Sequence, residues 1–354
     1  MTQTLIVGQG MAGSVLAWEL HQHGHAIRVI DDGHRTSASL AAAGMVNPVQ
    51  GQRLKLAWRI EDCLPVAHQF FEQVEKEFGE TFFHRTPILR LVNNEKEKDF
   101  LDQRLADERY QPFLGEYEQP GANTPLHDDF GGIRIKHAGY VSTAQLLIKL
   151  REYFEHEGIL CDAEFTHNEL SVDENGVRWR DLSAERIVFA EGFRILDNPW
   201  FSDFNFQPNK GEILTIQSDQ PLPDIPVNRG KWIIPQGKGA AWCGSTYGRG
   251  QTDSETTEAG AADIMAKVAN TMPSHEFKIV DHRAGVRCAT GDHIPRAGFH
   301  PEHPRIGVFN GFGSKGNVFI PWLAQRMAEH LITGASLPED CDFRARPPRK
   351  KRQA

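Results

Sequence analysis

Short apolar runs alternate with amphipathic stretches from the start of the chain, and this alternation predicts a mixed α/β fold. Residues 4–7 form an apolar run typical of a buried strand, residues 11–23 repeat apolar positions at helical spacing, and residues 26–30 are strand-like again. Strand, helix and strand in this order predict a βαβ unit with two parallel strands.

The same pattern predicts the later elements. Apolar residues recur at helical spacing over residues 66–78, 93–110, 144–157, 260–272 and 321–332. Strands are expected over residues 87–92, 186–192 and 306–309 and dominate residues 211–247, whereas residues 115–132 are rich in turn formers and predict a loop. The small residues at 36–45 predict a helix whose alanine surface allows close approach of a flat ligand.

The length and composition of the chain predict the number of domains and the cellular compartment. A chain of 354 residues with 40% hydrophobic and 24% charged residues is expected to form about two globular domains. The apolar runs are much shorter than a membrane span requires, and the N-terminus lacks the pattern of a secretory signal. We therefore expect a cytoplasmic protein that does not span a membrane.

Cysteines and charge exclude two further classes. The five cysteines are scattered and form no Cys-x-x-Cys pair, so neither a disulfide framework nor a metal site is predicted. A net charge of −8 does not favour general binding of nucleic acid.

A glycine-rich turn after the first strand carries the first chemical signal. Gly8 permits a tight turn, Gly10 allows a pyrophosphate to approach the backbone, and Gly13 allows helix and strand to pack closely. Asp31 follows 23 residues after Gly8, where an acid accepts hydrogen bonds from ribose hydroxyls and disfavours a 2′-phosphate. The pattern predicts dinucleotide binding. The alternative is a glycine-rich turn without a ligand. This alternative is disfavoured because three neighbouring glycines at the start of a helix lower stability unless a ligand or close packing needs the space.

The order of motifs resembles that of the FAD-dependent D-amino-acid oxidase family, which includes glycine oxidase and sarcosine oxidase. The resemblance covers residues 1–335 and rests on five pieces. They are the fingerprint with Asp31, residues 37–45, the helix entry at Gly139-Tyr140, the strand at 188–192, and residues 285–295 followed by the second glycine loop at 311–316.

The resemblance implies a Rossmann-like FAD-binding domain interleaved with a smaller substrate domain built on an antiparallel sheet. The expected FAD domain comprises residues 1–60, 137–200 and 281–336, the substrate domain residues 61–136 and 201–280, and residues 337–354 a basic, disordered tail. FAD is expected to bind non-covalently, because the spacing of Cys288 to Asp292 differs from that of relatives that attach it. The residues expected to contact FAD are Gly8, Gly10, Met11, Ala12, Gly13, Asp31, Asp32, Ser39, Ala43, Gly44, Met45, Phe165, Ala190, Gly192, Gly311, Gly313, Ser314, Lys315, Gly316 and Asn317.

The chemistry implied by the resemblance is oxidation of a C–N bond in an amino acid or secondary amine. Hydride moves from carbon to flavin N5, and water hydrolyses the resulting imine. Arg287 occupies the position of the partner for a substrate carboxylate, although it could instead form a structural ion pair. Trp232 and Tyr247 could face the substrate or lie in the core. Arg53 could bind a second acidic group or only seal the domain junction.

Two rival interpretations remain. The loop at 311–316 is similar to that of the FAD domain of the bifunctional tRNA 5-methylaminomethyl-2-thiouridine biosynthesis enzyme, which oxidises a group on a wobble uridine. The basic residues Arg344, Arg346, Arg349, Lys350, Lys351 and Arg352 would then contact RNA phosphates. The other rival is a non-catalytic flavoprotein subunit of a larger dehydrogenase. The oligomeric state is not predicted.

Overall fold

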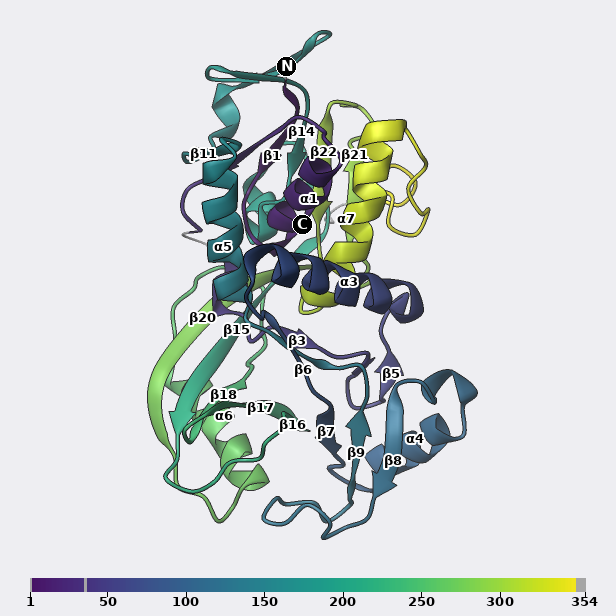
Figure 1. Cartoon of the computed structure of the whole chain (residues 1–354), viewed down its shortest axis with the longest axis vertical. Helices are drawn as coiled ribbons and strands as arrows, with labels where there is room; N and C mark the ends of the chain where they lie inside the picture. Colours follow the sequence, from purple (N-terminus) through teal and green to yellow (C-terminus); the bar gives the residue numbers. More distant parts are fainter. Residues whose placement is uncertain (1, 35–36, 348–354) are drawn as a thin grey trace.

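The first sheet has eight strands and contains the predicted βαβ unit. The computed structural model describes residues 2–34 and 37–347 (Figure 1). The strand order is β11-β2-β1-β14-β13-β12, with β22 beside β14 and β21 beside β22. Strands β11, β2, β1, β14 and β22 are parallel to one another, which confirms the predicted unit. The bounds are β1 Thr2–Val7, β2 Ile27–Asp31, β11 Leu160–Asp162, β12 Leu170–Asp173, β13 Gly176–Trp179, β14 Leu182–Phe189, β21 Arg296–Phe299 and β22 Ile306–Asn310.

Helices cover one face of this sheet. Because alternate strand residues point to opposite faces, the two faces pack into different cores. Ile6 and Val188 pack into the core shared with the helices, whereas Leu5, Val7 and Phe189 pack into an aromatic core on the other face. The helices are α1 (Met11–Gln22), α5 (Thr143–His156) and α7 (Gly316–Thr333), and α3 (Ile60–Phe78) packs against α7. In Figure 1, α3 runs between these helices and the second sheet.

The second sheet has nine strands in the order β19-β15-β18-β17-β16-β7-β9-β8, with β20 beside β15. Its pairs are antiparallel except for β16 with β7. Helix α6 (Glu258–Thr271) packs on one face, while Ile213, Ile234 and Trp232 lie on the other face, beside Ala43. The bounds are β7 Ile88–Leu91, β8 Leu114–Glu118, β9 Gly132–Ile135, β15 Phe206–Gln217, β16 Val227–Arg229, β17 Lys231–Gly237, β18 Ala240–Gly244, β19 Gly248–Arg249 and β20 Lys278–Thr290.

Short elements join the two sheets. β3 (Met45–Val46), β10 (Gly139–Val141) and β6 (Phe83–Arg85) form a three-stranded sheet, and β4 (Val49–Gln50) pairs with β5 (Lys55–Leu56). The remaining helices are α2 (Ala38–Ala41), α4 (Glu95–Leu105), η1 (Glu108–Tyr110), η2 (His167–Glu169) and η3 (Gly192–Asp197). The expected helix at 36–45 is thus only the short α2, because the backbone is already extended at Ala42. The expected loop at 115–132 includes most of β8.

The segment after α7 packs against the body of the protein as far as the structure describes it. The sequence analysis assigns residue 337 onward to a disordered tail, whereas Leu337, Cys341 and Phe343 are buried. Phe343 contacts Phe201 and Phe204, so these apolar residues account for the packing. The basic residues Arg349, Lys350, Lys351 and Arg352 lie outside the described residues.

The division into two domains stays a prediction. Helix α3, assigned from sequence to the substrate domain, contacts α7, a helix that packs against the first sheet.

In the described part of the chain, no helix is both long and apolar enough to cross a membrane.

Candidate active site

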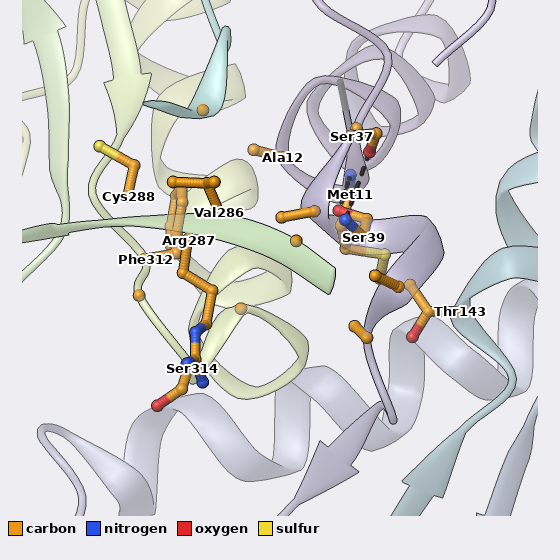
Figure 2. Close-up of a pocket in the computed structure, with 18 of the residues that line it drawn as sticks. Met11, Ala12, Ser37, Ser39, Thr143, Val286, Arg287, Cys288, Phe312 and Ser314 are labelled. Atoms are coloured by element: carbon orange, nitrogen blue, oxygen red, sulfur yellow. Dashed lines mark hydrogen bonds between the residues drawn. The ribbon is translucent and has the colours of Figure 1, made fainter. Parts of the chain in front are cut away.

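A cavity of about 540 Å³ lies where the two sheets meet. Its walls come from the loop after β1, the end of β2, the α2 segment, the end of β14, the strands β15–β17 and β20, and the loop before α7. In Figure 2, Met11, Ala12, Ser37 and Ser39 lie on one side, and Arg287, Cys288, Phe312 and Ser314 lie on the other. The volume is within the usual range for a cofactor or small-molecule site.

The first glycine loop is shaped by close backbone contacts. Gly8 has φ +95°, and a Cβ there would lie 2.7 Å from the carbonyl oxygen of Ala190. A Cβ on Gly13 would lie 1.8 Å from the carbonyl oxygen of Gly8, so Gly13 serves helix packing and does not line the cavity. Gly10, Met11 and Ala12 line the cavity at the N-terminus of α1. This is a suitable site for phosphate groups, because first-turn amides lack helical acceptors.

Asp31 is fixed by four donors at the end of β2. Its Oδ2 accepts a hydrogen bond from the Gln9 amide at 2.8 Å, and its Oδ1 accepts from the amides of Gly33 and His34. Arg151 of α5 forms an ion pair with Oδ1 at 3.0 Å. Oδ2 thus retains capacity for a further donor such as a ribose hydroxyl. Asp32 also lines the cavity and lies 3.6 Å from Arg194.

One unpartnered polar atom marks this end of the cavity as a ligand site. His34 lines the cavity and is buried, and its Nε2 has no hydrogen-bond partner among the described residues. Burial lowers the pKa of His34, so the neutral ring is favoured. Since an unpaired buried polar atom is costly, a polar ligand there would satisfy it.

The second glycine loop joins β22 to α7. Gly311 has φ +87° and forms the turn without lining the cavity, whereas Gly313, Ser314, Lys315 and Gly316 line it. Burial lowers the pKa of Lys315 to about 8. Its Nζ lies 3.4 Å from the carbonyl oxygen of Asn47 and has no ion-pair partner in the described residues.

Asn317 ties this loop to the α2 segment. Its Nδ2 donates to the carbonyl oxygen of Gly44 at 2.9 Å, and Asn317 and Gly44 both line the cavity. The other expected cofactor residues on the cavity wall are Ser39, Ala43, Met45, Phe165, Ala190 and Gly192. Ser39 Oγ also accepts a hydrogen bond from the Met11 amide, which links the first glycine loop to the α2 segment.

Arg287 brings a half-buried positive charge to the same cavity. Its guanidinium donates to the carbonyl oxygens of Asn209, Lys210 and Thr246 and to Ser245 Oγ, at 3.0 to 3.4 Å. No carboxylate lies within ion-pair distance among the described residues, so the structural ion pair considered from the sequence is not formed. Burial lowers the pKa of Arg287, and the nearby Tyr247 opposes the change. The site is therefore complementary to an anion.

The other expected catalytic residues have different positions. Trp232 is half-buried in the cavity wall, and Tyr247 is 66% exposed, with its ring 4.9 Å from the Arg287 guanidinium. Arg53 does not line the cavity. Its side chain is exposed, and its carbonyl oxygen accepts hydrogen bonds from Arg104.

Comparison with known proteins decides the family. A family model described as "FAD dependent oxidoreductase" (DAO) matches residues 3–330. The chain belongs to this family. It is an FAD-dependent oxidoreductase, and the shape and donors of the cavity fit that cofactor.

Individual relatives support the same assignment. The chain is 24% identical to glycine oxidase of Bacillus licheniformis, over 93% of this chain and 92% of the relative. It is 25% identical to the tRNA 5-methylaminomethyl-2-thiouridine biosynthesis bifunctional protein MnmC of Marinobacter nauticus, over 92% of this chain but 55% of that protein. The chain thus spans about half the length of the first curated relatives that it matches.

Solved structures share the fold. The glycine oxidase structure from Geobacillus kaustophilus superposes with a TM-score of 0.81 at 21% identity and covers 99% of both chains. The iminodiacetate oxidase from Chelativorans sp. BNC1 gives 0.77 at 20% identity and covers 95% of this chain and 97% of that one.

Three lining residues could not be found from sequence motifs. His34 follows the second strand but belongs to no sequence motif. Asn228 lies in a strand of only three residues, which is too short to show a periodic pattern. Ser245 enters the site because it follows the end of β18.

Outside the cavity, His300, Glu302 and His303 place potential metal-ligand atoms within 4.8 Å of one another, although no metal site is predicted from the sequence.

Proposed function

We propose that this enzyme oxidises the C–N bond of an amine that carries a carboxylate, such as an amino acid or an N-carboxymethyl amine. The observation that carries the proposal is Arg287, a half-buried guanidinium on the cavity wall without a carboxylate partner among the described residues. A substrate carboxylate would supply the missing negative charge and hold the reacting carbon in place.

FAD would be held non-covalently by the residues that the sequence analysis selected. The α1 N-terminus at Gly10–Ala12 would bind the pyrophosphate, and Asp31 would bind a ribose hydroxyl through Oδ2. The loop around Lys315 would stabilise negative charge on the reduced ring system. When bound, FAD supplies the hydride acceptor for the reaction.

The protein groups would position the substrate and protect the reaction from water. Arg287 would orient the carboxylate through its positive charge and through the one N–H, on Nη1, that is not donated to a protein acceptor. Trp232 would cover the reacting carbon from the second sheet. No protein nucleophile is needed, because the nitrogen lone pair assists hydride loss and water then hydrolyses the imine. Cys288, buried in the cavity wall, is unsuited to nucleophilic attack because burial raises its thiol pKa to about 12.

The test is anaerobic absorbance of the purified holoenzyme during addition of amino acids and N-alkylated glycines. Bleaching of the oxidised flavin by a carboxylate-bearing amine supports the proposal. Arg287→Lys is then expected to weaken substrate use by on the order of 2 to 4 kcal/mol while the flavin stays bound. Flavin bleaching by amines that lack a carboxylate, with unchanged kinetics for Arg287→Lys, would refute this role.

The relation to MnmC proteins supports a second candidate substrate, a modified wobble uridine in tRNA. The carboxymethylamino group of such a nucleoside would present the same carboxylate to Arg287. This candidate predicts bleaching by the modified tRNA and none by free amino acids. A flavin that no amine or tRNA reduces would favour a subunit that needs a partner.

A further inference from the structure

A buried ion pair reaches the cavity wall through Asn228. Arg90 of β7 lies 3.1 Å from Glu97 of α4, and the two side chains are only 9% and 7% exposed. Arg90 also donates from Nη1 to Oδ1 of Asn228, which lines the cavity. Glu97 is held in turn by the backbone amide and Nδ2 of Asn93. The buried side chains of Arg90 and Glu97 therefore hold the Asn228 amide in position.

The ion pair also decides which way the Asn228 amide faces. A guanidinium carries only donors, so the atom of Asn228 beside Arg90 must be the carbonyl oxygen. The Nδ2 group, with two donor hydrogens, is thus directed away from Arg90. No acceptor among the described residues receives a hydrogen bond from this Nδ2. Asn228 therefore presents a preoriented donor on the cavity wall.

This donor lies two strand spacings from the strand end that holds Ser245, a hydrogen-bond partner of Arg287. Asn228 on β16 is paired with Trp232 on β17, and Trp232 is paired with Gly244 at the end of β18. Ser245, the next residue, accepts a hydrogen bond from Arg287. Two strand spacings correspond to roughly 10 Å between the backbones of Asn228 and Gly244. We therefore expect a ligand group held by Arg287 beside Ser245 to lie beyond hydrogen-bond reach of Asn228.

We propose that Asn228 binds an acceptor oxygen at the end of the substrate remote from the carboxylate, and that Arg90 positions Asn228 for this contact. The inference rests on the proposed function and names its substrate class. The substrate is a secondary amine with a carboxymethyl group on one side of nitrogen and a carbonyl or carboxylate acceptor on the other. Glycine is too short to engage both Arg287 and Asn228.

The experiment compares two ligands that share the carboxymethylamino end. Sarcosine is the short ligand, and N-(2-carbamoylethyl)glycine adds an amide carbonyl on the other side of nitrogen. Dissociation constants are measured anaerobically from perturbation or bleaching of the flavin spectrum in the wild-type holoenzyme, Asn228→Leu, Asn228→Asp and Arg90→Lys. The Asp variant keeps an acceptor for Arg90 but replaces the donor that faces the cavity.

Both Asn228 variants are expected to bind the long ligand roughly tenfold more weakly and the short ligand within about twofold of wild type. Arg90→Lys is expected to show the same selective loss, because an ammonium cannot hold Glu97 and Asn228 in the geometry of the guanidinium fork. Asn175→Leu, in the exposed turn between β12 and β13, is the control and should change neither constant.

The outcomes separate the two proposals. If the wild-type flavin responds to the ligands but variants that unfold at the wild-type temperature lose both ligands equally or lose neither, the role of Asn228 is refuted and the proposed function stands. If neither ligand perturbs the wild-type flavin, the proposed function fails for N-carboxymethyl amines, and the inference about Asn228 fails with it. Thermal unfolding of each variant identifies a general loss of structure, which would weaken both ligands together.

Discussion

Gly211 leaves the space that the Arg287 guanidinium occupies. A Cβ at position 211 would lie 2.4 Å from Nη2 and 2.8 Å from Cζ of Arg287, whereas ordinary contacts begin at 3.4 Å. Gly211→Ala must therefore displace the guanidinium by about 1 Å, the difference between 3.4 and 2.4 Å. The hydrogen bonds from Nη2 to the carbonyl oxygens of Lys210 and Thr246, now 3.4 and 3.0 Å, cannot both survive this shift.

The expected effect falls on substrate use and spares the fold. A guanidinium displaced by about 1 Å would lose its hydrogen bond to the substrate carboxylate. Loss of such a charged hydrogen bond costs about 1.5 to 3 kcal/mol, so kcat/KM for a carboxylate-bearing amine should fall roughly 10- to 150-fold. Flavin content and unfolding temperature should change little, because the clash involves the end of a long side chain. Steady-state kinetics of Gly211→Ala are compared with those of Gly291→Ala, where a Cβ meets nothing closer than 3.4 Å. An unchanged kcat/KM in Gly211→Ala would refute the anchoring role of Arg287.

Two further predictions concern folding and pH. Gly44→Ala should lower the free energy of unfolding by more than about 3 kcal/mol in urea titrations, because its Cβ would lie 1.9 Å from the Val141 carbonyl oxygen at a φ of +70°. Gly51→Ala, at φ +69° with no atom within 4 Å, should cost only about 1 kcal/mol, and equal losses would contradict the steric explanation. The pKa of Lys315 falls from 10.5 to about 8 on folding, so the unfolded chain binds more protons between these values and stability rises with pH. Flavin-free Lys315→Met should therefore unfold at a higher temperature than wild type at pH 7, and the difference in unfolding temperature should narrow towards pH 10. A difference that does not depend on pH would refute the lowered pKa of Lys315.

The end of the cavity at the first glycine loop could be predicted well from sequence because its elements are local. Gly8, Gly10 and Asp31 belong to one βαβ unit, whose spacing follows from the geometry of strand and helix. The sequence could not show that Asp31 also binds Arg151, because α5 is more than a hundred residues away along the chain.

The end of the cavity at Arg287 was harder to predict because it depends on contacts between distant strands. Arg287 could be selected by its motif, but Gly211 and Ser245, which give it space and a partner, are recognised only from strand register. Arg53 shows that closeness in sequence to a motif does not place a side chain in the cavity. It lies close to the Gly44-Met45 motif in sequence, yet the turn after β4 directs its side chain to solvent.

The interleaving of segments around the cavity has a consequence for biosynthesis. The cavity wall begins with Val7 and is completed by residues as late as Ile320 in α7, so most of the chain must be synthesised before the pocket exists. A ribosome-bound chain that ends before β22 would hold the first glycine loop but lack the second one. Capture of the flavin is therefore expected only near the end of translation, and truncated chains should emerge without the yellow colour of the bound cofactor.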